Sequence, residues 1–224
     1  MFPYCAVVLV YSAAFGPGTG WLYGPDIVAT AGHCLNTGEQ VWVPLTGKYP
    51  LRIGYRTQPG EPYRWCGARR LYSARGWTDG GDERYDYGAI ALDRDIGSEL
   101  GWLGVGWTDR PLTGHTATHL GYGMRRWQEL RTESDFDPIQ LAGHGHVRDE
   151  IDGQTFYDIP TDRGSSGGPI LVDGLPPGCV AAIHTTAAHP DDDSLPAAHR
   201  QYSHGTAVSK YVFDNLIAWR DHRD

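Results

Sequence analysis

The sequence predicts an all-β protein built from small antiparallel barrels. Short apolar runs alternate with turn signals along most of the chain, which is the pattern that barrels of short strands produce. The 224 residues include 30 glycines, 15 prolines and 8 tryptophans, and this composition favours turns and aromatic-rich strands over helices. A helical apolar stripe occurs near the C-terminus. We therefore expect many short strands followed by one long helix.

Apolar runs in the first half of the chain predict a first set of strands. The run at 6–11 suits a buried strand, and the glycine-rich residues 15–20 predict a turn after it. Residues 97–110 carry no clear period, so we interpret them as the crossing between an N-terminal barrel (1–110) and a C-terminal barrel (111–224). The strands expected in the first barrel are 6–11, 20–24, 26–30, 41–44, 51–55, 64–72 and 87–92.

A second set of strands and the terminal helix follow. The strands expected here are 114–121, 141–147, 155–159, 170–172, 180–184 and 205–208. Ser209 is a good N-cap for the helix, because its hydroxyl can accept a free backbone N–H. Apolar residues then recur at spacings of three and four, which places them on one helical face: Tyr211, Val212, Leu216, Ile217 and Trp219.

Residues 164–168 read Gly-Ser-Ser-Gly-Gly and contain a candidate nucleophile. A serine flanked by glycines lets the backbone turn tightly and leaves the hydroxyl exposed. The N–H groups of Gly164 and Ser166 can point toward one developing oxyanion and so form an oxyanion hole. Taken alone, this stretch would be interpreted as an ordinary Ser/Gly-rich turn.

Two other stretches supply partners for Ser166. His33 follows the apolar run at 26–30, and Asp86 precedes the apolar run at 87–92. The three residues occur in the chain order His, Asp, Ser, which is the order of chymotrypsin-like proteases. Each of them stands where a strand begins or ends, so we predict a catalytic triad of His33, Asp86 and Ser166.

With these residues in place, the chain resembles the bacterial glutamyl endopeptidases of the chymotrypsin-like serine protease superfamily. The resemblance implies two six-stranded antiparallel barrels and a C-terminal α-helix, with the site in the cleft between the barrels. His33 and Asp86 would come from the first barrel and Ser166 from the second, and an acyl-enzyme would form without a metal or organic cofactor. The segments that carry the resemblance are 20–34, 85–90 and 206–219.

The resemblance also implies selectivity for glutamate at P1. His184 matches the family's carboxylate-binding histidine, Thr161 matches a hydroxyl of the same pocket, and Thr185 adjoins it. A histidine N–H and a hydroxyl can together bind a carboxylate. Pro160 occupies the place of the acidic residue of trypsin-like pockets, so we do not expect cleavage after Arg or Lys. Alternatively, His184 ends a strand in the core.

Composition excludes several functions. The net charge of −8 argues against non-specific nucleic-acid binding, and no apolar run approaches the ~20 residues of a membrane helix. We expect a monomer that acts on protein or peptide substrates. The first four residues carry no positive side chain, so we interpret 6–11 as a strand and recognise no signal peptide. The resemblance nevertheless implies a secreted enzyme.

Cysteines and histidines leave further alternatives open. The four cysteines Cys5, Cys34, Cys66 and Cys179 allow two disulfides or four thiols, and a secreted enzyme should hold at least one disulfide. In the family Cys34 pairs with a position held here by Gly18, so its partner would be Cys66 or Cys5. The pairs His115 and His119, and His144 and His146, lack further ligands, so we predict no metal site.

Two other functions fit the sequence. One is an inactive protein of protease fold that binds partners or peptides. The other is an active serine hydrolase with a different P1 preference or an esterase activity.

Overall fold

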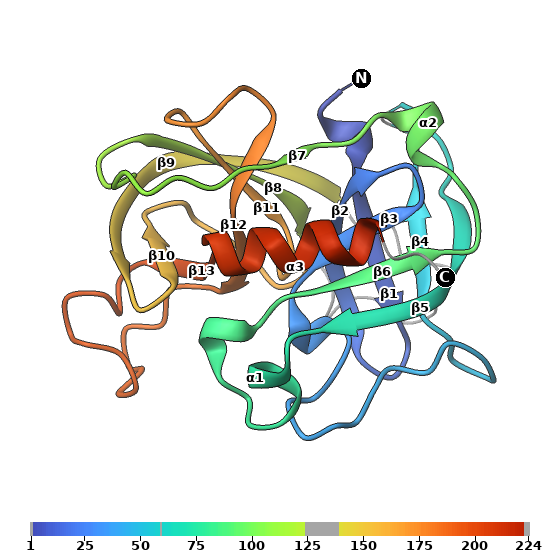
Figure 1. Cartoon of the computed structure of the whole chain (residues 1–224), viewed down its shortest axis with the longest axis horizontal. Coiled ribbons are helices and arrows are strands. Elements are labelled where there is room, and N and C mark those ends of the chain that lie inside the picture. The colour runs from blue at the N-terminus through green and yellow to red at the C-terminus, as the bar shows by residue number, and fades with distance from the viewer. Residues whose placement is uncertain (1, 59, 124–138, 222–224) are drawn as a thin grey trace.

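The computed structural model describes residues 2–58, 60–123 and 139–221, which form two β-barrels and a C-terminal helix (Figure 1). The described helices are too short and too polar for any of them to cross a membrane. The barrels lie next to each other, and the strands of each are consecutive in the chain. The expectation of an all-β fold with two six-stranded barrels is confirmed.

The first barrel is closed and has the strand order β1-β2-β3-β6-β5-β4, with every neighbouring pair antiparallel. Its strands follow the apolar runs because each run buries side chains inside the barrel. They are β1 Val7–Ser12, β2 Gly16–Gly24, β3 Ile27–Thr30, β4 Arg52–Tyr55, β5 Arg64–Ser73 and β6 Gly88–Leu92.

The second barrel closes through a pairing between β11 and β12, and its order is β11-β8-β9-β10-β13-β12. A seventh, two-residue strand, β7, pairs in parallel with β12. The strands are β7 Gly104–Val105, β8 Thr116–Gly123, β9 Ile139–Ile151, β10 Gln154–Tyr157, β11 Pro169–Val172, β12 Cys179–Thr186 and β13 Ser203–Ala207.

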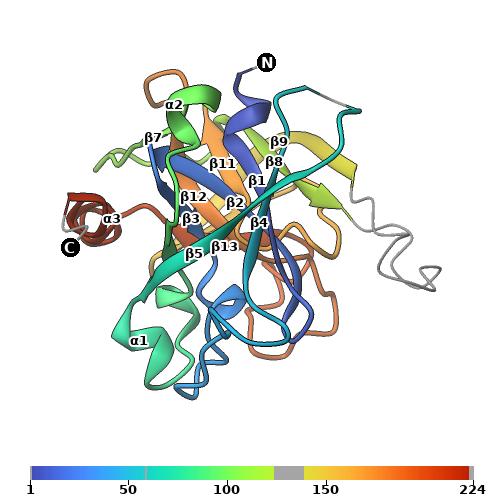
Figure 2. The same ribbon diagram turned by 90° about the vertical axis from the view of Figure 1, so that its right-hand side faces the viewer.

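Helices are few in the described residues. The helix α3 begins after Ser209, whose hydroxyl accepts the Val212 N–H at 3.3 Å, so the expected N-cap is confirmed. Figure 2 shows α3 end-on at the outer side of the barrels. The α-helices are α1 Arg75–Thr78, α2 Gly97–Leu100 and α3 Lys210–Asp221, and the 3-10 helices are Tyr4–Ala6, Gly32–Cys34 and Glu83–Tyr85.

The helix α3 follows the second barrel in the chain but packs against the first. The Trp219 ring stacks on Tyr72 of β5, with centroids 5.7 Å apart, and contacts Tyr87 at 5.6 Å. Asn215 Nδ2 donates to the Tyr87 hydroxyl at 2.6 Å. The helix therefore links the end of the second barrel to the segment that leads from Asp86 into β6.

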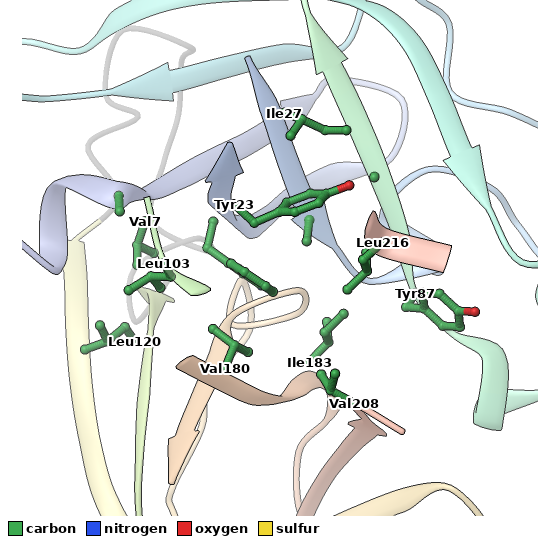
Figure 3. Close-up of a cluster of buried hydrophobic side chains, with 14 of the residues drawn as sticks. Val7, Tyr23, Ile27, Tyr87, Leu103, Leu120, Val180, Ile183, Val208 and Leu216 are labelled. Atoms are coloured by element: carbon green, nitrogen blue, oxygen red, sulfur yellow. The ribbon is translucent and has the colours of Figure 1, made fainter. Parts of the chain in front are cut away.

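One apolar cluster joins both barrels and the helix, and it fixes their relative position. In Figure 3, side chains of the first barrel such as Val7 and Tyr23 meet Val180 and Ile183 of the second, and Leu216 of α3 completes the group. These side chains are almost fully buried. Because burial of each such side chain stabilises the fold by roughly 1.5–3 kcal/mol, separating the barrels would be costly.

Two expectations about the first half of the chain were wrong. Residues 41–44 are not a strand and form only an isolated bridge between Asn36 and Trp42; Val43 is buried, but Val41 and Trp42 are 55% and 40% exposed. Strand β2 begins at Gly16, so most of the expected turn at 15–20 is strand. Strand β7 precedes residue 110 yet pairs with the second barrel, and the division into 1–110 and 111–224 stays a prediction.

None of the four cysteines, all of which lie in the described residues, forms a disulfide. A Cβ added to Gly18 would lie 2.7 Å from Cys34 Sγ, so Gly18 does face Cys34, as the resemblance implies. Cys5 and Cys66, the expected alternative partners of Cys34, lie with Cys34 at a second apolar cluster, inside the first barrel. Neither forms a disulfide with Cys34. Burial raises the pKa of Cys66 to about 12, which makes this thiol unreactive. The structure therefore contains no disulfide.

We expect Leu216→Ala to lower the free energy of unfolding by about 2–5 kcal/mol, because Leu216 is fully buried between helix and barrels. Asp214→Ala on the same helix removes only an exposed ion pair with Lys210 and should cost less than about 0.5 kcal/mol. Urea denaturation of both variants measures the difference. Equal losses would contradict the role of α3 in joining the barrels.

Candidate active site

His33 and Asp86 form a doubly hydrogen-bonded pair in the first barrel. His33 lies in the 3-10 helix that follows β3, and Asp86 lies just before β6, the neighbour of β3 in the sheet. The His33 backbone N–H donates to Asp86 Oδ1 at 2.7 Å, and His33 Nδ1 lies 2.7 Å from Asp86 Oδ2. Since a carboxylate only accepts, Nδ1 carries the proton and Nε2 is left with a lone pair.

The environment of His33 favours its charged form. Burial of the ring by itself disfavours the charge, but the Asp86 carboxylate, assisted by Cys34, outweighs burial and raises the pKa of His33 well above its ordinary value. Asp86 is only 4% exposed, so little water reaches the carboxylate itself. The ring is therefore held in one tautomer and readily accepts a proton at Nε2.

Gly32 and Trp77 shape the surroundings of this pair. A Cβ on Gly32 would lie 3.0 Å from Asp86 Oδ1 and 2.8 Å from the Trp77 ring, so a glycine is needed for their close approach. The Trp77 ring meets His33 edge-on, with centroids 6.3 Å apart, and its Nε1–H donates to the Asn36 carbonyl at 2.9 Å. Trp77 was not predicted to be part of the site.

The Asp86 segment is also held from the second barrel. The buried Thr206 hydroxyl of β13 lies 3.2 Å from the Asp86 carbonyl oxygen and 3.4 Å from that of Glu83. Gln154 Nε2 donates to Glu83 Oε2 at 3.5 Å, and His204 Nε2 lies 3.8 Å from the same oxygen. His204 is the main cause of a lowered pKa of Glu83. These residues were not predicted.

Ser166 lies in a loop whose shape depends on two glycines. Gly164 and Gly167 have φ values of +96° and +86°, which glycine adopts without strain. A Cβ on Gly167 would lie 2.1 Å from the Thr19 carbonyl oxygen of the first barrel. The loop is tied to β12, because the Gly167 N–H donates to the His184 carbonyl at 2.7 Å. It therefore lies where the barrels meet.

In the described residues the two N–H groups expected to form the oxyanion hole have no partner, whereas the Ser166 hydroxyl has one. Neither the Gly164 nor the Ser166 N–H donates to another residue within the described ranges, so both can bind an oxyanion. The Ser166 hydroxyl donates to the Thr185 carbonyl at 3.4 Å, and no hydrogen bond joins it to the His33 ring in the part of the chain that the structure describes. In sites without substrate such catalytic hydrogen bonds are often unformed.

His184 of β12 is 1% exposed, and Tyr157 holds its ring. His184 Nδ1 lies 2.6 Å from the Tyr157 hydroxyl. Burial raises the pKa of Tyr157, so the hydroxyl keeps its proton and is available as a donor to Nδ1. Burial, followed by the nearby rings of His119 and His204, lowers the pKa of His184. The ring is therefore neutral, and in the tautomer that accepts the Tyr157 proton at Nδ1 its N–H is at Nε2.

The other two expected substrate-binding residues have separate partners. The Thr185 hydroxyl donates to the His204 carbonyl at 3.4 Å, while its own carbonyl accepts from Ser166. The Thr161 hydroxyl lies 3.1 Å from the Ser203 hydroxyl of β13 and is not hydrogen-bonded to His184 in the described residues. The structure thus brings His184 and Thr185 next to Ser166, whereas it places Thr161 against β13.

The expected histidine pairs do not form metal sites in the described residues. His115 lies 3.2 Å from the Asp173 carbonyl, and His144 hydrogen-bonds to Thr118, so neither ring faces a second ligand. His119 is instead buried with its ring centroid 5.2 Å from that of His184. Among the residues that the structure describes, no group of three His, Cys, Asp or Glu side chains could hold a metal ion.

The sequence profile of the trypsin-like peptidase domain matches residues 18–175, a span that includes His33, Asp86 and Ser166. The chain belongs to the trypsin-like peptidase family. Over 98% of its length it is 30% identical to the glutamyl endopeptidase of Bacillus licheniformis. Over 97% it is also 30% identical to a Bacillus subtilis protein named extracellular metalloprotease. The chain spans 64% of the length of each relative.

Solved structures share the fold of this chain. A Glu endopeptidase in complex with MPD superposes with a TM-score of 0.77 at 19% identity, over 99% of this chain and 93% of that one. A scabies mite inactivated protease paralogue gives a TM-score of 0.69 at 15% identity, over 96% of this chain and 93% of that one. At these identities the comparison establishes the fold alone, which is the chymotrypsin-like fold expected from the sequence.

The pKa values of His33 and His184 should lie on opposite sides of the ordinary value of about 6.5. We expect the His33 imidazole signals in NMR to titrate above it and those of His184 below it. Asp86→Asn removes the charge that raises the pKa of His33, so the His33 titration should move to lower pH while that of His184 stays in place. A His33 titration that Asp86→Asn leaves unchanged would contradict this account.

Proposed function

We propose that the chain is a serine endopeptidase in which Ser166 is the nucleophile, His33 the general base and Asp86 the residue that orients His33. One observation carries the proposal: the Asp86 carboxylate binds both the backbone N–H and Nδ1 of His33, each at 2.7 Å. This arrangement leaves Nε2 free to accept a proton. The unpaired N–H groups of Gly164 and Ser166 support the same function.

The mechanism follows from these roles. Ser166 Oγ attacks the carbonyl carbon of the substrate peptide as His33 Nε2 takes the hydroxyl proton. The carbonyl oxygen becomes an oxyanion that accepts hydrogen bonds from Gly164 and Ser166. His33 then gives the proton to the leaving amine, and an acyl-enzyme remains on Ser166. Water activated by His33 hydrolyses this ester. The scheme involves no metal or organic cofactor.

We further propose a preference for glutamate at P1. The Nε2–H of neutral His184 is a hydrogen-bond donor for a carboxylate, and the hydroxyls of Thr161 and Thr185 are candidate further donors. The glutamyl endopeptidase of Bacillus licheniformis, 30% identical to this chain, is named for such an activity. The alternative, a different P1 preference, has support in Thr161, whose hydroxyl contacts Ser203 and not His184.

Oligomeric state, substrate class and location complete the proposed function. We propose that the enzyme acts as a monomer on protein or peptide substrates outside the cell. The name of the Bacillus subtilis relative, an extracellular metalloprotease, supports this location, whereas the absence of a disulfide among the described cysteines gives it no support.

A second candidate function is that of an inactive binding protein with a protease fold. The observation that favours it is the Ser166 hydroxyl, which donates to the Thr185 carbonyl at 3.4 Å and not to His33. A fluorophosphonate probe separates the two functions. An adduct on Ser166 of the folded protein supports the enzyme, and its absence would favour the binding protein.

We expect Ser166→Ala and His33→Ala each to lower kcat by about 10⁶-fold, because the two residues act as one unit. The double variant should be scarcely slower than either single one. Rates on a peptide substrate that yields a chromogenic amine measure this. Losses that multiply in the double variant would show that Ser166 and His33 act independently.

We expect His184→Ala to lower kcat/KM for a glutamyl substrate at least about tenfold, since one hydrogen bond to a charged group contributes about 1.5–3 kcal/mol. The matched glutaminyl substrate should lose much less, because it carries no charge to bind. Tyr157→Phe, which removes the partner that fixes the His184 tautomer, and Thr161→Val should act in the same direction more weakly.

An equal loss with both substrates would make His184 a structural residue and remove the basis of the glutamyl preference. Cut sites from a peptide library would then identify the true P1 residue.

A further inference from the structure

Thr19 of β2 holds the nucleophile loop from the opposite barrel. Its backbone N–H donates to the Ser166 carbonyl at 2.7 Å, and its hydroxyl lies 2.7 Å from the Gly164 carbonyl oxygen. Thr19 is fully buried, so no water competes for these contacts. A single residue of the first barrel thus binds both residues whose N–H groups would form the oxyanion hole.

The direction of the hydroxyl proton follows from the other partner of Thr19. The Tyr122 backbone N–H donates to Thr19 Oγ1 at 2.8 Å, so this oxygen accepts from Tyr122. A hydroxyl has one proton, which is then directed to the carbonyl of Gly164. The Thr19 carbonyl in turn accepts the Thr30 hydroxyl at 2.7 Å. Every polar group of Thr19 is therefore paired, and the residue is fixed on both sides.

The hydrogen bond from the Thr19 hydroxyl matters because it restrains the backbone of Gly164. Gly164, at φ +96°, has no side chain and would populate many backbone conformations if it were free. Holding its carbonyl oxygen restricts the rotation of its peptide groups. Since the Gly164 N–H has no partner within the described ranges, its direction is set by the rest of this backbone. An N–H group that already points at the position of the oxyanion stabilises it without reorganisation during the reaction.

We propose that the Thr19 hydroxyl is a positioning residue of the oxyanion hole, acting through Gly164. The inference rests on the proposed serine endopeptidase function. Thr19 itself touches no reacting atom. Its loss should weaken binding of the tetrahedral transition state and leave binding of the planar substrate unchanged.

The test compares Thr19→Val with Thr19→Ser. Removing a whole oxyanion donor costs about 10²–10³ in kcat, so we expect misplacing one to lower kcat about 10- to 100-fold with KM changed less than about twofold. Thr19→Ser keeps the hydroxyl and should stay within about threefold of the wild type. A peptidyl trifluoromethyl ketone, which forms a tetrahedral oxyanion adduct, should lose affinity by the same factor as kcat. A product peptide should bind as before.

Ser12→Ala provides a matched control in the same barrel. The Ser12 hydroxyl is also buried, donates to a carbonyl, that of Tyr49, and accepts a backbone N–H, that of Ala14, each at 3.3 Å. It makes no hydrogen bond to the nucleophile loop among the described residues. Ser12→Ala should therefore lower thermal stability and leave kcat unchanged.

Thr30→Val keeps the inference testable if Thr19→Val does not fold. It removes the hydrogen bond to the Thr19 carbonyl and should lower kcat, with KM unchanged, by less than Thr19→Val would. An unchanged kcat in a folded Thr19→Val, a loss in KM alone, or a Thr19→Ser as slow as Thr19→Val would overturn the role of Thr19. An inactive wild type would overturn the proposed function as well.

Discussion

The site depends on a fixed contact between the two barrels, because its chemical groups are divided between them. The shared apolar cluster sets their approach, but apolar packing is not directional. Two buried threonine hydroxyls supply direction. Thr19 of the first barrel binds the loop of Ser166, and Thr206 of the second binds the backbone of Asp86. Each barrel therefore positions a reactive segment of the other.

Burial acts differently on two histidines of the site, and the partner of each explains why. His33 and His184 both lie in surroundings that disfavour a charged ring. His33 faces a carboxylate, which reverses the effect and prepares the ring to accept a proton. His184 faces the neutral Tyr157 hydroxyl and other histidines, so it stays neutral. One ring is thereby suited to proton transfer, and the other to hydrogen bonding.

The features that could be predicted from the sequence are those that short local patterns determine. Apolar runs located most strands, the serine cap and the three-four spacing located α3, and the motifs around His33, Asp86 and Ser166 identified residues that the fold brings into one region. Failures had two causes. The run at 41–44 buries Val43 but leaves Val41 and Trp42 exposed, and it pairs with the chain only through an isolated bridge. Thr19, Tyr157 and Thr206 act through partners far away in the chain, and no local pattern distinguishes them from other buried polar residues.

The backbone and the side chain of His184 have separate tasks. The His184 carbonyl accepts the Gly167 N–H at 2.7 Å, and its N–H donates to the Gly168 carbonyl at 2.9 Å, so the main chain braces the nucleophile loop whatever side chain is present. The side chain makes its own contact with Tyr157. A substitution of His184 can therefore change the group presented beside Ser166 without altering the main-chain hydrogen bonds that hold the loop of Ser166.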